Sequence, residues 1–168
     1  MLKRSNTALK VLKFAHLLAA CFWIGGAVSL AALNLFNPYA NSSGMLYGIN
    51  ASGHRIDLWV VIPGACGCLI TGLLYSWFTP WGFFKHRWII LKWLITVGGI
   101  LSGTFLLGQW EELMGGMSKE IGIAALAYAP FLEVKARHLS VGMIQLAILG
   151  VAVFLSVFRP WKNSGKPE

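Results

Sequence analysis

Four long apolar runs constrain this chain more than any other feature of its sequence. They cover residues 14–36, 56–78, 88–110 and 139–158. Each run is close to the roughly 20 residues that a helix needs to cross the hydrocarbon core of a bilayer. Because backbone groups in lipid have no water to bond, a run of this length is expected to be helical. We therefore predict four transmembrane helices.

The composition agrees with a membrane protein. Of the 168 residues 57% are hydrophobic and 12% are charged, and the mean hydropathy is +0.65; soluble domains carry about a quarter charged residues. The first run is longer than the roughly 7–15 apolar residues of a cleavable signal peptide, so we expect it to remain as an anchor. The predicted fold is an all-α, up-down, four-helix transmembrane bundle forming one domain over residues 1–168, with helices at about 8–36, 55–78, 87–112 and 136–159.

Basic residues gather on one predicted side of the membrane. The N-terminal tail, the second loop and the C-terminal tail contain Lys3, Arg4, Lys10, Lys13, Lys85, Arg87, Arg159, Lys162 and Lys166. The other two loops contain four basic and five acidic residues. Because an excess of Lys and Arg marks the cytoplasmic side, both termini are predicted to be cytoplasmic. The net charge of +8 is then explained by contact with the headgroups of the lipid bilayer, and no nucleic-acid partner is expected.

The two outer loops differ in what they predict. The first loop, residues 37–53, is rich in Asn, Ser and Gly and is expected to be irregular. The third loop contains a segment at about 119–129 that is typical of an amphipathic helix on the outer membrane surface, interrupted near Pro130. The alternative is that the fourth helix begins early, near Phe131.

Four histidines suggest a cofactor. His16, His54, His86 and His138 each lie near the end of a different apolar run. With cytoplasmic termini, His16 and His86 fall on the inner side, and His54 and His138 on the outer side. Each pair belongs to helices that are diagonal partners across an up-down bundle.

That placement suits a haem held by one His from each of two helices. The predicted cofactor is haem b, with His16, His54 and His138 as iron ligands. His86 is a further candidate for cofactor binding, although it lies on a different face from the small and polar stripe of its own helix.

His16 and Lys92 form the strongest pair of candidate residues. His16 lies inside its apolar run, where a polar group is costly and by default indicates function. Lys92 lies about one turn into the third helix, at a similar depth. Lys92 either extends toward the lipid headgroups or faces the core, where it can pair with a haem propionate or an acidic ligand. One site can therefore contain both residues.

Methionines support an alternative site for copper. Met45, Met114 and Met117 all fall in predicted outer loops, on the side of His54 and His138. Thioether and imidazole groups suit copper, particularly Cu(I). A copper-handling membrane protein is therefore the alternative function. A third possibility is an accessory membrane subunit without a cofactor.

Several short motifs resemble known families. HLLAACFWIGG at 16–26, Thr71–Gly72, and WIILKW containing Lys92 resemble the CopD-like and HemJ-like families of bacterial inner-membrane proteins. The chain is more similar still to a related group of bacterial integral membrane proteins of unknown function. We expect that group to share a TPWG-type second loop, here 79–82, and a closing segment like SVFRPW, here 156–161.

The resemblance implies a multi-pass protein of the bacterial inner membrane. HemJ-like proteins are associated with haem b and protoporphyrinogen oxidation, and His16 and Lys92 match their pattern. CopD-like proteins are associated with copper uptake or resistance. The chain departs from the HemJ-like pattern at the end of the first helix, where it has LNLFNPY rather than a Pro-Arg segment. The expected function is membrane electron transfer or porphyrin-linked redox chemistry, with a haem-dependent oxidoreductase as the enzyme class, working with a membrane redox partner or a quinone.

Overall fold

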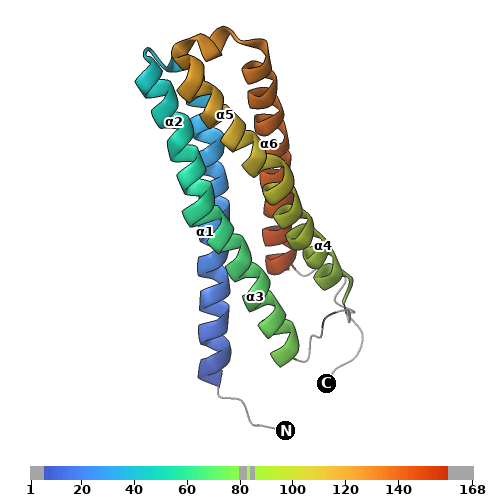
Figure 1. Cartoon of the computed structure of the whole chain (residues 1–168). Coiled ribbons are helices and arrows are strands. Elements are labelled where there is room, and N and C mark those ends of the chain that lie inside the picture. The colour runs from blue at the N-terminus through green and yellow to red at the C-terminus, as the bar shows by residue number, and fades with distance from the viewer. Residues whose placement is uncertain (1–5, 80–82, 84–85, 159–168) are drawn as a thin grey trace.

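The protein is a bundle of four long helical spans (Figure 1). The computed structural model describes residues 6–79, 83 and 86–158. Its helical spans are each long and apolar enough to cross a membrane, and they cover Thr7–Tyr39, Ser43–Phe78, Arg87–Ala127 and Ala129–Phe158. The all-helical class and the four apolar helices agree with the predicted helical membrane bundle.

Two of the four spans contain a short π-helical segment. The first span is α1 (Asn6–Phe36) followed by the 3-10 turn η1 (Asn37–Tyr39). The second consists of α2 (Ser43–Ile56), the π-helical η2 (Asp57–Val61) and α3 (Ile62–Phe78). The third consists of α4 (Arg87–Ser102), the π-helical η3 (Gly103–Leu107), α5 (Gly108–Ile121) and the 3-10 turn η4 (Gly122–Ala127). The fourth is α6 (Ala129–Phe158).

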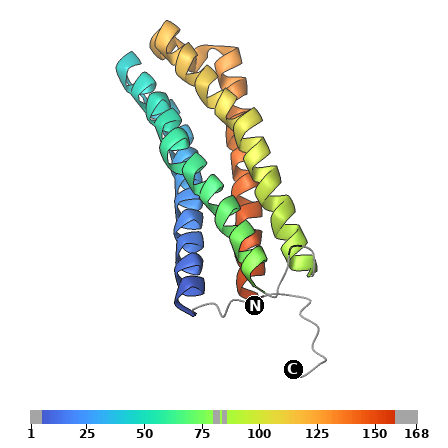
Figure 2. The ribbon, with the colours of Figure 1, turned by 60° about the horizontal axis from the view of Figure 1, so that its bottom comes forward.

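Successive spans are neighbours around the bundle. Helix α1 packs on α3 and α6, α2 packs on α5, and α4 packs on α3 and α6. The first and third spans are therefore diagonal partners, and so are the second and fourth. The start of α1 and the end of α6 lie at one end, here called the terminal end, whereas η1 and η4 lie at the other, the connection end (Figures 1 and 2).

The basic residues that predict the orientation are only partly described. Lys10, Lys13 and Arg87 lie at the terminal end, within or at the start of helices. The remaining members of that set, which are Lys3, Arg4, Lys85, Arg159, Lys162 and Lys166, lie outside the described residues, as do most of the TPWG motif and the end of SVFRPW.

The first outer loop is mostly helical, which corrects the prediction of an irregular segment. Helix α2 begins after Ser42, whose hydroxyl accepts a hydrogen bond from the backbone N–H of Met45 (3.2 Å). Such a cap satisfies a backbone donor that the first turn leaves free. Leu46 and Asn50 are buried where α2 packs on α5. Tertiary packing therefore outweighs the low helix propensity of the Gly and Asn residues.

The third span is also longer than predicted. It continues beyond residue 112 to Ile121, and the segment expected as a separate surface helix at 119–129 is divided between the end of α5, the turn η4 and the start of α6. Helix α6 begins at Ala129, as in the alternative in which the fourth helix starts early. A cluster of buried apolar side chains holds these segments together at the connection end. It consists of Ala40, Leu46, Met114, Ala125 and Phe131.

Glycines allow α1 and α3 to approach closely. A Cβ atom added to Gly64 would stand 2.6 Å from the backbone nitrogen of Trp23 and 3.0 Å from the carbonyl oxygen of Ala19. A Cβ on Gly67 would stand 3.0 Å from the Cβ of Ala19. Small residues at such a contact are typical of membrane helix pairs. This interface fixes the position of the α1 side chains that face the terminal half of the bundle.

Candidate functional site

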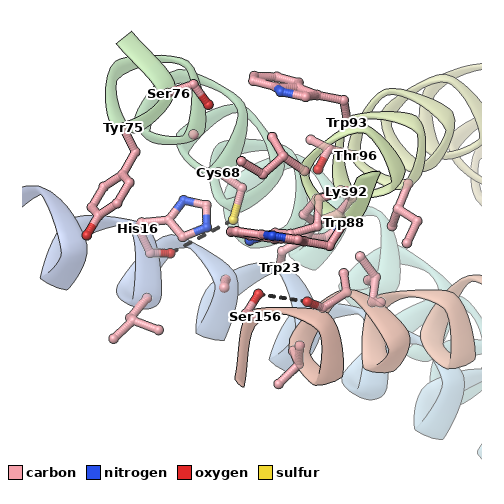
Figure 3. Close-up of a pocket in the computed structure, with 18 of the residues that line it drawn as sticks. His16, Trp23, Cys68, Tyr75, Ser76, Trp88, Lys92, Trp93, Thr96 and Ser156 are labelled. Carbon is pink, nitrogen blue, oxygen red and sulfur yellow. Dashed lines mark hydrogen bonds between the residues drawn. The ribbon is translucent and has the colours of Figure 1, made fainter. Parts of the chain in front are cut away.

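A cavity of about 310 Å³ lies in the terminal half of the bundle, between α1, α3, α4 and α6 (Figure 3). Most of its lining is apolar. The polar side chains that reach it are Lys13, His16, Tyr75, Ser76, Thr79, Lys92, Thr96 and Ser156. Ligand and cofactor pockets usually measure about 300–1,000 Å³, so this cavity is at the lower end of that range.

His16 is held in one tautomer by Thr71 of α3. The Nδ1 atom of His16 lies 2.8 Å from the Thr71 hydroxyl oxygen. That hydroxyl donates its own hydrogen to the carbonyl oxygen of Gly67, at 2.5 Å. Because a carbonyl oxygen only accepts, the Thr71 oxygen must accept from His16, and Nδ1 carries the ring hydrogen. The other nitrogen, Nε2, therefore has a bare lone pair, and among the described residues it has no hydrogen-bond partner.

Lys92 lines the same cavity as His16. It comes from α4, and its ammonium lies 5.9 Å from the centroid of the Trp88 ring, which is within cation–π range. Lys92 is also close enough to His16 for their charges to interact. In Figure 3 the side chains of His16, Cys68, Trp88 and Lys92 surround one space. The structure thus brings together the two residues that the sequence places at similar depth.

Small residues make room beside this pair. A Cβ on Gly72 would lie 3.9 Å from the Cε1 atom of His16, which is an ordinary van der Waals contact, so the glycine leaves this side of the imidazole without a side chain packed on it. A Cβ on Gly99 would lie 3.0 Å from the Trp23 indole, which is almost fully buried. Trp23 and Trp88 form part of the buried apolar core behind the cavity. The cavity is therefore backed by two buried indole rings, whereas the His16 ring itself is half-buried.

His86 lies outside the cavity. It precedes α4, where its carbonyl oxygen accepts hydrogen bonds from the N–H groups of Ile89 (3.0 Å) and Ile90 (3.3 Å). Its ring stacks on Trp88, with the ring centroids 6.2 Å apart. His86 is not among the cavity-lining residues. The cofactor-binding role predicted for it has no support from this position.

His54 and His138 occupy different environments at the connection end. His54 is exposed on α2, whereas His138 is buried on α6. The Nδ1 atom of His138 lies 3.1 Å from the amide nitrogen of Asn34, and its Nε2 atom lies 2.9 Å from Glu111. Both ring nitrogens of His138 thus have protein neighbours. A haem iron would have to displace one of these neighbours to bind the ring.

The three methionines predicted for copper have different environments. Met114 is buried among apolar side chains, and Met117 packs against the same cluster. Met45 is exposed on α2. Among the described residues there is no group of three or more His, Cys, Asp or Glu side chains positioned to hold a metal ion.

Sequence reasoning missed a second polar cluster at the connection end. Asn34, Glu111 and His138 are buried together, and Asp57 lies nearby. From the sequence, Glu111 and Asp57 are expected only to add charge to the outer loops. A signal was present, because each apolar run has at least one polar side chain within a few residues of its connection end.

Comparison with known proteins gives no independent guide to these sites. No family model matches the chain, and no curated protein or solved structure is significantly similar to it. The function is therefore argued from the geometry of the cavity.

Proposed function

We propose that this chain is a multi-pass protein of the bacterial inner membrane that binds haem b in the cavity lined by His16. Its role would be membrane electron transfer or porphyrin-linked redox chemistry, as the resemblance to CopD-like and HemJ-like proteins implies. One observation carries the proposal. His16 lines an apolar cavity with Nδ1–H bonded to Thr71 and with the Nε2 lone pair free.

The donor set fits a haem. A histidine that ligates a metal almost always donates its other ring N–H to a neighbouring oxygen, which fixes the tautomer and the ring orientation. The Thr71 oxygen supplies that acceptor for His16. Haem iron is commonly held by a histidine in a pocket whose polarity sets its chemistry. The apolar lining suits a macrocycle, and Lys13 and Lys92 supply positive charge for its carboxylates.

Each residue then has a defined role. A bound haem would supply one-electron redox chemistry. His16 would hold the iron, and Thr71 would keep the imidazole in the ligating tautomer. Lys92 would neutralise a propionate, while Trp23 and Trp88 would exclude water. With the termini in the cytoplasm, as the charge distribution favours, this cavity would lie in the cytoplasmic half of the membrane, where a quinone or a membrane redox partner can approach through the lipid.

An absorption spectrum tests this proposal directly. The protein is purified in detergent from cells supplied with haem precursors and copper, and spectra are recorded oxidised and after dithionite, with metal analysis on the same sample. We expect a Soret band and sharpened α and β bands after reduction. His16→Ala should lower haem occupancy at least tenfold, and added imidazole should restore part of it.

Two matched variants locate the site. His54→Ala removes an exposed histidine at the opposite end of the bundle, and His86→Ala removes one outside the cavity; both should retain haem. If haem persists in His16→Ala but is lost in His54→Ala, the cavity assignment is wrong. Copper without a Soret band would favour the copper-handling alternative. A protein with neither group would contradict haem binding and favour an accessory subunit.

A further inference from the structure

A buried polar cluster in the connection half of the bundle shares no residue with the His16 cavity. Asn34 of α1, Glu111 of α5 and His138 of α6 are only 3%, 5% and 4% exposed. Asp57, the first residue of η2, is close enough to Glu111 and His138 for their charges to interact. Ionisable side chains are expensive inside a membrane bundle and by default mark a functional site.

The hydrogen bonds of this cluster have a fixed direction. The amide nitrogen of Asn34 donates to the backbone carbonyl oxygen of Lys135, at 3.3 Å. Because a carbonyl oxygen accepts only, this bond orients the amide, and the same nitrogen lies 3.1 Å from Nδ1 of His138. Nδ1 must therefore be an acceptor. His138 is a neutral imidazole whose hydrogen is on Nε2.

The carboxylate of Glu111 is left incompletely bonded. Its Oε2 atom lies 2.9 Å from Nε2 of His138, within pairing distance. The two atoms are poorly aligned, however, and this buried oxygen has no hydrogen-bond partner among the described residues. A buried acceptor without a donor costs free energy. A proton on the carboxyl, or a water beside it, would remove that cost.

Among the described residues, the basic side chains whose charges interact with Asp57 are the two histidines His54 and His138. The titratable groups that face them are Asp57 and the exposed His54 from the second span, Glu111 from α5 and His138 from α6; α1 contributes the uncharged Asn34. Arg137 pairs with Glu133 on the exposed face of α6. Among the described residues, no Lys or Arg contacts Asp57 or Glu111. Two acids beside a neutral imidazole have excess negative charge, and a proton is the smallest counter-charge that fits.

The backbone is shaped around these carboxyl groups. Any side chain at Gly53 would collide with the Oε1 atom of Glu111, and a Cβ on Gly108 would stand 3.5 Å from Oδ2 of Asp57. The π-helical segments η2 and η3 both lie here, and such segments are frequent at functional sites. Residues of both segments line a small cavity of about 30 Å³ together with His138 and Gln145. That volume is enough for one water molecule.

From this geometry we propose that Asp57 and Glu111 together bind one exchangeable proton inside the bundle. A hydronium ion delivers the proton: its O–H bond breaks and leaves water, while a new O–H bond forms on one of the two carboxylates. The proton returns to water as hydronium when it leaves. The small cavity between η2, η3 and α6 holds the delivering water. The Nε2 atom of His138 lies beside the Glu111 carboxyl group. This site is independent of haem and is measurable on the protein without a cofactor.

Infrared spectroscopy of the full chain tests the proposal. A protonated carboxyl group has a C=O stretching band that is separate from that of a carboxylate. We expect such a band at neutral pH and its reversible loss as the pH is raised. Asp57 is the only aspartate in the chain, so ¹³C-labelled aspartate shifts its contribution without any mutation. ¹³C-labelled glutamate shifts the remainder.

Variants identify the glutamate. Glu111→Gln should remove the glutamate part of the band, whereas Glu112→Gln, which changes the exposed neighbour on α5, should leave it unchanged. Isotope labelling of the unmodified protein gives the assignment to residue type even if Glu111→Gln fails to fold. The proposal is overturned if no protonated carboxyl is present at neutral pH. It is also overturned if the band belongs to neither Asp57 nor Glu111, or if it does not respond to pH.

Discussion

Replacing Thr71 with valine tests whether the Thr71 hydroxyl, which accepts a hydrogen bond from His16 Nδ1–H, is needed for haem binding. Valine has nearly the same shape as threonine but lacks the hydroxyl, so Thr71→Val removes the acceptor of the His16 Nδ1–H while keeping the α1–α3 contact filled. Thr71→Ser is the matched control, because it keeps the hydroxyl and removes only the methyl group. The valine variant should weaken haem binding, and the serine variant should bind nearly as the unmodified protein does.

Two arguments give the size of the expected loss of haem affinity. Loss of a partner that orients a metal-ligating side chain typically costs about 10–100-fold in affinity, which corresponds to about 1.4–2.8 kcal/mol. Leaving a buried donor without its acceptor costs about 1–3 kcal/mol. His16 is only half-buried, so water can reach part of the ring and replace some of the lost bonding. We therefore expect a loss near tenfold for Thr71→Val and less than threefold for Thr71→Ser.

Titration of haem into the cofactor-free protein, followed at the Soret band, measures both affinities. The reduced spectrum gives a second observable, because a freely rotating imidazole broadens the α band. Equal affinity and equal band shape in the two variants would refute the assignment of Thr71 as the group that orients His16. A loss that is as large in Thr71→Ser would point to packing rather than to the hydroxyl.

Three further predictions test the fold, the ligand and the orientation. Gly64→Ala should lower the free energy of unfolding by about 1–3 kcal/mol, because the new methyl group meets the backbone of α1. Gly25→Ala is the control, because no atom lies within 4 Å of the added methyl group, and it should change thermal unfolding little. Equal effects of the two variants would contradict the close α1–α3 contact. Among the described residues, His16 is the one histidine that lines the cavity. A reduced haem bound there should therefore bind carbon monoxide, which shifts the Soret band. A spectrum typical of two histidine ligands would argue against this site. If both termini are cytoplasmic, Asn41→Cys, at the exposed α1–α2 connection, should react in intact spheroplasts with a membrane-impermeant thiol reagent, and labelling only after lysis would reverse the orientation.

Much of the fold follows from hydropathy alone, because a bilayer allows few arrangements of four apolar runs. The helix ends were harder to predict. Glu111 and Glu112 lower the hydropathy beyond residue 110, yet α5 continues to Ile121 because α2 packs along it. The same partner turns the Gly-rich loop after Tyr39 into a helix. Local composition reports where the lipid-facing segment ends, and it does not report how far two helices remain packed beyond it.

The candidate site shows a similar division. Helical spacing and depth were enough to place His16 and Lys92 at one level, and both line the cavity. The role of Thr71 was not predictable, since it depends on which nitrogen of His16 faces α3. The pairing of His138 with Glu111 was missed because the acid was assigned to a loop. A depth argument locates polar residues along a helix, but their partners depend on rotation about the helix axis.

The two polar regions differ in what the surrounding glycines do, and that difference determines what each can bind. Beside His16, Gly72 places no side chain against the imidazole, and His16 lines a cavity of about 310 Å³. Beside Glu111, Gly53 is in contact with the carboxylate itself, so the space is already occupied. The remaining volume there is suited to a single water. The cavity of the terminal half measures about 310 Å³ and that of the connection half about 30 Å³, so we propose the large apolar ligand for the first and a proton for the second.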